Sequence, residues 1–332
     1  MTKRYVVTGG GGFVGKALCK ALRARGHEVL SLARGNYPEL VQLGISCAQI
    51  DIGAPGSSWH ELLQGYDGVF HTAAKVDMWG RRGDFYRTNV VGTRNILDAC
   101  RAVGIHNVVF TSSPSVIHDG NDLIGVDESY PYPKHFDAYY PETKAIAERE
   151  VLAANNGSEL KTVALRPHLI WGPHDTNLIP TIVARGRSGK LKQIGEGLNR
   201  VDLTFIDDCV NAHILAMEAL ERGDHNVCGK VYFISQGDPV SMWEWINQVL
   251  EKHNVPIVTR SIPKRVALLA ARILESLATI AGWCGITWKP LLTRFLVSEM
   301  STHHYFSIDA AKRDLGYRPS CTIRQAMERT FG

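Results

Sequence analysis

A tyrosine and a lysine four positions apart, Tyr140 and Lys144, are residues that could carry out acid–base chemistry. The stretch 139–150 consists mostly of good helix formers, and Pro141 suits a first helical turn, so we expect a helix that begins at Tyr139. Residues four apart share one face of a helix, which places the ammonium beside the phenol. A positive charge there would lower the pKa of the tyrosine from its ordinary value of ~10 and make it a usable proton donor or acceptor.

The same spacing also occurs in exposed helices that do no chemistry, so the surrounding sequence has to decide. Residues 108–113 form an apolar run that ends in hydroxyls, and they predict a buried strand that delivers Ser113. A glycine-rich turn follows another apolar run near the N-terminus. A strand with a serine, a helix with tyrosine and lysine, and a dinucleotide turn are together the parts that a hydride-transfer enzyme requires.

The glycine-rich turn follows a predicted strand, residues 5–8, and opens a predicted helix, residues 16–25. Its glycines keep the G-x-x-G-x-x-G spacing, which permits a tight turn and lets the backbone approach a pyrophosphate at the positive end of the helix. The alternative is a turn that is merely flexible. We assign five residues of the turn to cofactor binding: Gly9, Gly12, Phe13, Val14 and Gly15.

The end of the second predicted strand, residues 27–34, bears on which cofactor is bound. A carboxylate there would bind the 2′-hydroxyl of the adenosine ribose, but the chain has Ala33 followed by Arg34. An arginine can grip a 2′-phosphate through two hydrogen bonds, so NADP(H) is favoured over NAD(H). The alternative for Arg34 is an exposed side chain on a loop.

Further candidate cofactor contacts lie where other predicted strands end. Asp51 and Ile52 follow a short strand and could lie near the adenine, although an acidic residue there can also be a turn former. Ala73 and Ala74 end a strand in small side chains that leave room for a cofactor. Pro167, which ends the strand 160–166, is assigned to the same site.

Strands alternate with helices along the first half of the chain, which predicts a Rossmann-like, doubly wound parallel sheet of the α/β class. We expect residues 1–166 to be mainly the dinucleotide-binding domain. Residues 167–332 should be mainly a smaller substrate lobe, with about 200–235 returning to the first domain. The regular alternation is lost after residue 167, where glycine-rich loops become frequent.

The composition is that of an ordinary globular chain, with 45% hydrophobic residues and a formal net charge of +4 over 332 residues. A charge of that size does not indicate nucleic acid as a partner. Seven scattered cysteines without a C-x-x-C pair, and the lack of a secretory segment at the N-terminus, predict reduced thiols in the cytoplasm. The histidines, including His168, His174 and the pair 303–304, lack metal-site spacing; we assign them packing or surface roles and expect no metal.

Residues 266–283 are nearly all apolar apart from four positions at helical spacing, and we expect these to form one polar stripe: Arg272, Glu275, Ser276 and Thr279. One interpretation is a lid or packing helix. The other is a helix that lies on a membrane surface or lines the way in for a lipid-like substrate. The segment 263–288 is therefore a candidate for peripheral membrane contact.

The whole chain resembles the extended short-chain dehydrogenase/reductases, and within them the 3β-hydroxysteroid dehydrogenase family. The resemblance is carried by the glycine turn, Ser113, Tyr140 and Lys144, and by these further motifs: residues 89–95 (Asn-Val-Val-Gly-Thr-x-Asn), 166–173, 201–208 and 315–319. Two groups of that family look similar. Bacterial 2-alkyl-3-oxoalkanoate reductases are similar at residues 34–40, 144–148 and 292–296, and sterol-4-carboxylate 3-dehydrogenases at 115–117, 166–168 and 326–330.

The resemblance implies a role for each catalytic residue. Tyr140 would exchange a proton with the substrate oxygen, Ser113 would hold that oxygen, Lys144 would also bind the nicotinamide ribose, and Asn89 would order the site. The expected function is a cytoplasmic NADPH-dependent ketoreductase for a bulky 3-oxo acid. A sterol 3-dehydrogenase and a cofactor-binding sensor without activity stay open as alternatives, and the family often forms homodimers through the helix that bears tyrosine and lysine.

Overall fold

The computed structural model describes residues 1–54 and 58–332, and its centre is a parallel sheet of seven strands. The strand order is β12-β7-β5-β4-β1-β2-β3. The bounds are β1 Arg4–Thr8, β2 Glu28–Ala33, β3 Ser46–Gln49, β4 Gly68–His71, β5 Asn107–Thr111, β7 Lys161–Pro167 and β12 Val231–Ile234. The predicted Rossmann-like sheet is confirmed.

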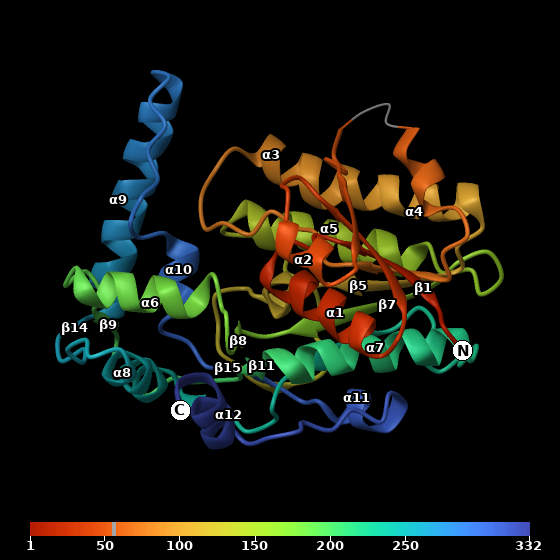
Figure 1. Ribbon diagram of the computed structural model, residues 1–332. Coiled ribbons are helices and arrows are strands. Elements are labelled where there is room, and N and C mark those ends of the chain that lie inside the picture. The colour runs from red at the N-terminus through yellow and green to blue at the C-terminus, as the bar shows by residue number, and fades with distance from the viewer. Residues whose placement is uncertain (55–57) are drawn as a thin grey trace.

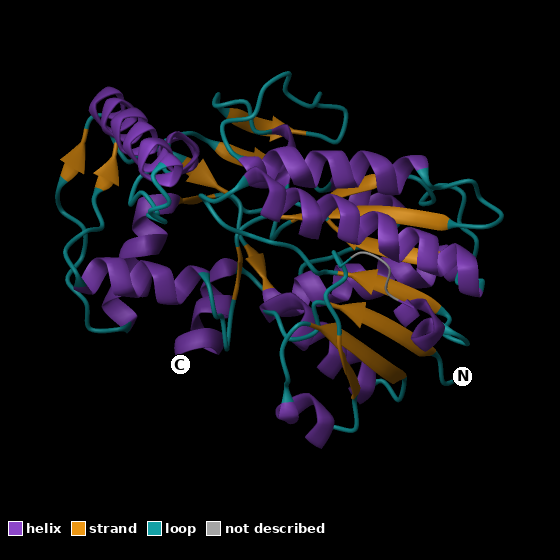
Figure 2. Ribbon diagram, turned by 90° about the horizontal axis from the view of Figure 1, so that it is seen from above, coloured by secondary structure: helices purple, strands orange, loops and turns teal. Residues whose placement is uncertain are grey.

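Helices cover both faces of this sheet (Figures 1 and 2). Helices α1 (Phe13–Ala24) and α7 (Ile206–Glu221) pack together on one face, and α4 (Gly92–Val103) and α5 (Tyr139–Ala153) on the other. Successive strand residues point to opposite faces, so Val7 and Val109 join the core under α1 and α7 while Val6 and Val108 join the core under α4 and α5. Strands buried on both faces explain the continuous apolar runs in the sequence.

Short elements connect these layers. They are α2 Pro38–Gln42, the 3₁₀ turns η1 Ser58–Leu63 and η3 Pro114–Ile117, α3 Arg82–Tyr86, and the π-helical turn η2 Arg87–Val91. Helix α3, the turn η2 and helix α4 follow one another without a break and form one continuous helical run with a π turn at its centre.

The C-terminal lobe is built from short strands and peripheral helices. Its four-stranded sheet has the order β13-β10-β15-β6, with bounds β13 Val240–Ser241, β10 Arg200–Val201, β15 His304–Phe306 and β6 Leu123–Val126. Two strand pairs are β8 Ile170–Trp171 with β11 Thr204–Phe205, and β9 Gln193–Ile194 with β14 Ser261–Ile262. The helices are α6 Leu178–Arg187, α8 Met242–Lys252, α9 Lys264–Trp283, α10 Arg294–Glu299, α11 Asp309–Asp314 and α12 Ile323–Phe331.

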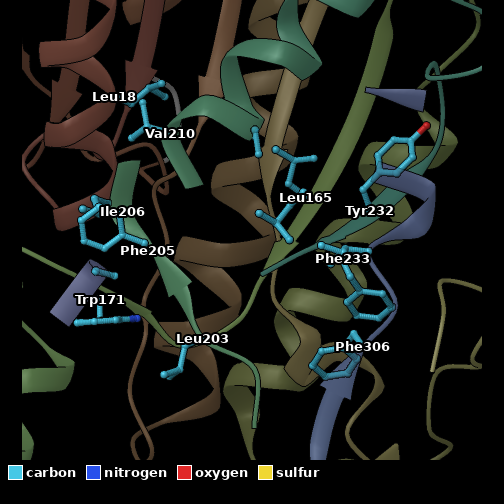
Figure 3. Packing of buried hydrophobic residues seen from close by; sticks show 14 of the residues in the cluster. Leu18, Leu165, Trp171, Leu203, Phe205, Ile206, Val210, Tyr232, Phe233 and Phe306 are labelled. Atoms are coloured by element: carbon cyan, nitrogen blue, oxygen red, sulfur yellow. The ribbon is translucent and has the colours of Figure 1, made fainter. Parts of the chain in front are cut away.

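One apolar core runs from the large sheet into this lobe (Figure 3). Phe233 on β12 stacks on Phe306 of β15 with ring centroids 4.4 Å apart, and Trp171 on β8 packs edge-on against Phe205 of β11. The lobe is thereby held against the carboxyl end of the sheet, which is where the predicted site residues lie.

Candidate active site

The glycine turn between β1 and α1 has the shape that a dinucleotide needs. Gly9 adopts φ +71°, and a Cβ on it would lie 2.8 Å from the Ala73 backbone. A Cβ on Gly15 would lie 2.3 Å from the Gly9 carbonyl oxygen, so the turn packs directly on the helix. Gly12 is the N-cap of α1 and provides no side-chain cap, which leaves first-turn N–H groups for a ligand. These residues fit a pyrophosphate.

The residues assigned to the adenosine end lie around β2 and β3. Arg34 directly follows β2 and is exposed, and its carbonyl accepts a hydrogen bond from Gln49 Nε2 at 2.8 Å. Asp51 accepts a hydrogen bond from Gly53 N at 3.0 Å, which is the turn-forming arrangement that the sequence left open. Ile52 is buried against Gly92, and its carbonyl accepts from Asn95 Nδ2 at 2.6 Å. Arg34 is therefore more accessible to a ligand than Asp51 or Ile52.

Tyr37 is a neighbour of the glycine turn that sequence reasoning missed. Its ring lies where a Cβ on Gly11 would be, 1.9 Å from the nearest ring carbon, and Lys16 Nζ lies 5.5 Å from the ring centroid. A glycine is therefore required at position 11 as well. The aromatic residue three positions after Arg34 was the signal available in the sequence.

Ser113 and Tyr140 meet beyond the carboxyl end of β5. Ser113 is the N-cap of η3. Its hydroxyl accepts hydrogen bonds from Ser115 N at 3.2 Å and Ser115 Oγ at 3.0 Å. Tyr140 lies in the first turn of α5, which begins at Tyr139 as predicted. The hydroxyls of Ser113 and Ser115 both act on the phenol and oppose a rise of its pKa. The structure therefore brings Ser113 and Tyr140 together.

The pKa of Tyr140 differs from the expectation. Burial raises it above the ordinary value, and the charge of Glu299 on α10 raises it further. Lys144 does not offset this, because its Nζ donates to the Thr111 carbonyl at 2.6 Å and lies 3.9 Å from the centroid of the Phe110 ring. The predicted lowering of the Tyr140 pKa by Lys144 is thus wrong, because the ammonium is bound to β5 and the phenol is desolvated.

Lys144 itself has a strongly shifted pKa. Burial lowers the pKa of its ammonium to about 7, and Glu148, one turn later on α5, opposes this shift. Lys144 in turn adds to the effect of burial on His71, whose pKa is lowered to about 3. His71 is therefore a neutral imidazole at neutral pH.

Because His71 is neutral, the direction of each hydrogen bond along a buried chain can be assigned. Thr93 Oγ1 donates to the Asn89 carbonyl at 2.6 Å, so it accepts from His71 Nε2 at 2.9 Å. The other ring nitrogen, Nδ1, then accepts from Thr8 Oγ1 at 2.7 Å. Thr8 Oγ1 also accepts from Ala73 N at 3.2 Å. This chain joins the glycine turn and Ala73 to the π turn.

The π turn presents Asn89 to the catalytic helix. Asn89 Oδ1 accepts from Lys75 N at 2.7 Å, and its Nδ2 donates to Thr143 Oγ1 on α5 at 3.0 Å. Asn89 thus ties the segment after Ala74 to the turn of α5 that carries Tyr140 and Lys144. The ordering role expected for Asn89 has its geometry here, whereas the link through His71 and Thr93 was not foreseen.

Glu148 and Arg166 form a buried ion pair that anchors the catalytic helix. Arg166 Nε and Nη2 donate to the two Glu148 oxygens at 2.9 and 2.6 Å, and Tyr132 donates to the same carboxylate at 2.6 Å. Both charged side chains are essentially inaccessible to water. The pair fixes α5 on β7 just before Pro167, so Pro167 lies on the strand next to the one that delivers Ser113.

Buried histidines lie on the other side of the site. His304 Nε2 donates to the Glu299 carbonyl at 2.6 Å, so Nδ1 of this neutral ring accepts from His168 Nε2 at 2.6 Å. His118 Nε2 contacts Ser298 Oγ at 3.0 Å. The packing role predicted for His168 and His304 is confirmed, and within residues 1–54 and 58–332 no cluster of metal-ligating side chains is present.

The low pKa of Lys144 predicts a pH-dependent stability. Between pH about 7 and 10.5 an unfolded lysine holds its proton while the buried one has lost it, so the unfolded state binds more protons and the free energy of unfolding rises with pH. Denaturant titrations of the cofactor-free protein over this window should show that rise. The Lys144→Met variant should show a smaller one, because all other titrating groups are common to both proteins; equal slopes would contradict the shift.

Similarity to known proteins identifies the family of this chain. The chain matches the 3-beta hydroxysteroid dehydrogenase/isomerase family over residues 6–263. It is 44% identical to the 2-alkyl-3-oxoalkanoate reductase of Stenotrophomonas maltophilia over 98% of both chains. It is 36% identical to the human sterol-4-alpha-carboxylate 3-dehydrogenase, decarboxylating, over 99% of this chain and 87% of that protein. The two groups named by the sequence motifs are therefore confirmed as relatives.

Solved structures agree on the fold. The UDP-glucuronic acid 4-epimerase of Bacillus cereus, solved in complex with NAD, superimposes with a TM-score of 0.74 at 20% identity, covering 99% of this chain and 97% of the epimerase. A likeness at that identity shows the fold alone. The family match and the two relatives show that the chain belongs to the 3-beta hydroxysteroid dehydrogenase/isomerase family and is an NAD(P)-dependent oxidoreductase that interconverts a hydroxyl and a ketone.

Proposed function

We propose that this protein is an NADPH-dependent reductase of 2-alkyl-3-oxoalkanoates, that is, of β-keto acids with large apolar chains. The observation that carries the proposal is the meeting of Ser113 and Tyr140 beyond the carboxyl end of β5, with Lys144 bound to Thr111 of the same strand, in a chain 44% identical along its length to a reductase of that name. Identity to the sterol enzyme is lower, at 36%. The sterol 3-dehydrogenase is therefore the second candidate.

Each residue of the site has a part in the reaction. The nicotinamide supplies the hydride when it is bound. Tyr140 gives its phenolic proton to the ketone oxygen as the alcohol forms, and Ser113 donates a hydrogen bond to the same oxygen. Lys144 would bind the nicotinamide ribose, as the family resemblance implies, and its Nζ donates to the Thr111 carbonyl at the end of β5. The buried Glu148–Arg166 pair holds α5 on β7, and Asn89 ties α5 to the segment after Ala74.

Cofactor binding draws on the loops at the carboxyl ends of four strands. Gly9, Gly12, Phe13, Val14 and Gly15 would hold the pyrophosphate at the start of α1. Ala73, Ala74 and Pro167 would border the nicotinamide half, and Asp51 and Ile52 the adenine. We assign cofactor binding mainly to residues 1–166 and substrate binding mainly to 167–332, with β12 and α7 belonging to the cofactor domain because they complete its layers.

Turnover assays test the proposal. Purified enzyme is given a long-chain 2-alkyl-3-oxo acid or its 3-hydroxy form, and a 4-carboxysterol, each with NADP(H) and NAD(H). We expect turnover of the alkyl acid. Turnover of the sterol alone would replace the first candidate with the second, and cofactor binding without turnover of either would favour the sensor that lacks activity.

Arg34 is proposed to select NADP(H), because it is exposed at the end of β2 where no carboxylate would repel a 2′-phosphate. We expect Arg34→Ala to weaken NADPH binding by about one to two orders of magnitude, which is the loss of a charge-assisted hydrogen-bonded pair of ~1.5–3 kcal/mol. NADH binding should change little. Fluorescence titration with both cofactors measures the difference, and an equal loss for both would remove Arg34 from this role.

Location and assembly follow from the same proposal. We infer a cytoplasmic enzyme whose segment 263–288 contacts a membrane, since its substrate is lipid-like and α9 is long and apolar enough to reach the hydropathy of a membrane helix. We also infer a homodimer through the face of α4 and α5, as the family resemblance implied. Size-exclusion chromatography with light scattering, on wild type and on an Arg94→Glu variant of that face, tests the dimer.

A further inference from the structure

Helix α9 packs with its small residues inward and its large ones outward. Ala267, Ala271 and Ala278 are buried, whereas Leu269, Ile273 and Leu277 are 60%, 52% and 51% exposed. In Figure 1 the helix stands away from the body of the protein, with its first turn near β14 and α6. This arrangement is unfavourable in water, because the hydrophobic effect favours burial of the large apolar side chains. The exposed face is therefore suited to an apolar partner.

One residue of the expected polar stripe, Glu275, does not face outward, and this decides how the helix can meet a membrane. Glu275 is buried on the inner side and accepts hydrogen bonds from Arg294 N and Nε of α10, both at 2.7 Å. The single stripe expected for these four residues is therefore divided: Arg272, Ser276 and Thr279 are exposed, whereas the Glu275–Arg294 ion pair lies on the same side as the buried alanines and holds α9 on the protein. A helix held in this way can lie on a bilayer but cannot span it without exposing Glu275 to hydrocarbon.

The far end of α9 continues the apolar surface. Trp283 is 82% exposed, and Ile286, Trp288 and Leu291, in the loop that follows α9, are exposed as well. Between Glu275 and Lys289 the sequence has no charged residue. Tryptophan prefers the boundary between headgroups and acyl chains, where its ring is buried and its N–H is hydrated.

Basic residues lie around the N-terminal half of α9. The segment 178–195 contains Arg185, Arg187, Lys190 and Lys192 and no carboxylate. The segment 254–274 likewise contains only basic charges, namely Arg260, Lys264, Arg265 and Arg272. We call these eight residues the basic edge.

The basic edge is one surface because β9 and β14 pair in parallel, with Gln193 opposite Ser261. Figures 1 and 2 place this pair at the outer side of the protein, beside the first turn of α9. None of the eight side chains forms an ion pair with any residue in 1–54 or 58–332. Their charge is therefore available to an external anion.

We propose that the exposed face of α9 and the basic edge together dock this enzyme on an anionic lipid surface, with α9 lying in the headgroup layer. The apolar side chains enter the acyl boundary and the basic edge meets anionic headgroups. A second copy of the chain fits less well, because an isologous contact would meet this same face, whose segments 178–195, 254–274 and 276–288 contain no carboxylate to pair with the basic edge. The proposal deepens the membrane contact proposed above and names the lipid chemistry.

Two ion pairs connect this surface to the catalytic centre. Arg294, which binds Glu275 of α9, also lies 3.1 Å from Asp137, three residues before Tyr140. Lys289 Nζ lies 2.5 Å from Asp77, which follows the Ala73–Ala74 segment. The docked face is thus attached to both chain segments that lead into the site, which places the site next to the lipid from which an apolar substrate would come.

Vesicle co-sedimentation of the purified full chain tests the docking. We expect binding to phosphatidylcholine vesicles that contain phosphatidylglycerol, and weak binding to phosphatidylcholine alone. A charge variant, Lys190→Gln with Lys192→Gln and Arg265→Gln, should weaken binding to the anionic vesicles by roughly fivefold per charge, or about a hundredfold. An apolar variant, Leu269→Gln with Ile273→Gln and Leu277→Gln, should lose binding to both kinds of vesicle.

A matched control replaces equally exposed apolar residues elsewhere, Val41→Gln with Leu62→Gln, and should bind vesicles as the wild type does. NADPH titration shows that each variant is folded, and this readout does not depend on the substrate assigned above. Equal binding to neutral and anionic vesicles, or none to either, would overturn the proposal. So would a change from dimer to monomer in the apolar variant, because α9 would then bind a second copy. Failure of the turnover assays with intact vesicle binding would count against the proposed reaction alone.

Discussion

The Tyr140→Phe variant should lose turnover by roughly 10²–10⁴-fold, because the phenol is the group that exchanges a proton with the substrate oxygen. The ring remains, so packing at the start of α5 and the glycine turn are unchanged, and the dissociation constant for NADPH should stay near that of the wild type. Steady-state kinetics and fluorescence titration on the same preparation give both values.

The neighbouring tyrosine supplies the control for this prediction. Tyr139 is also in the first turn of α5 but is exposed, and its ring packs beside Phe85 with centroids 6.4 Å apart. Tyr139→Phe removes the same hydroxyl from the same helix turn and should leave turnover close to that of the wild type. Comparable turnover in the two variants would show that Tyr140 is not the proton donor.

The Glu148→Ala variant should lose about 3–5 kcal/mol of the free energy of unfolding. It leaves the Arg166 guanidinium buried without its carboxylate partner, and it also removes the acceptor for Tyr132. Activity should fall as well, because the helix that carries Tyr140 and Lys144 loses its attachment to β7. Denaturant unfolding measures the first effect, and turnover at saturating cofactor measures the second.

Another ion pair on the same helix is the matched control. Glu150 pairs with Arg94 through two hydrogen bonds, but both side chains are partly exposed to water. Glu150→Ala should cost no more than about 1 kcal/mol, the usual range for a surface pair. A double variant, Glu148→Met with Arg166→Met, should be more stable than Glu148→Ala, since it leaves no lone buried charge. Similar losses for Glu148→Ala and Glu150→Ala would contradict the argument from burial.

Features that depend on local sequence could be predicted. The turn at Gly9, Gly12 and Gly15 needs glycine for reasons of backbone conformation and close approach, and the helix from Tyr139 follows from propensity and from the position of Pro141. The alternation of strands with helices likewise sufficed for the parallel sheet. In each case the physical cause lies in neighbouring residues or in successive elements, so the sequence by itself determined the outcome.

Features that depend on which atoms meet across the fold were decided only by the tertiary structure. The amine of Lys144 reaches the carbonyl of Thr111 on β5, so its charge lies there and burial controls the Tyr140 pKa. Glu275 belongs to an apolar-looking helix but turns inward because Arg294, nineteen residues later, meets it. Hydrophobic periodicity says which face of a helix is polar, but the partner that approaches that face determines whether it is buried.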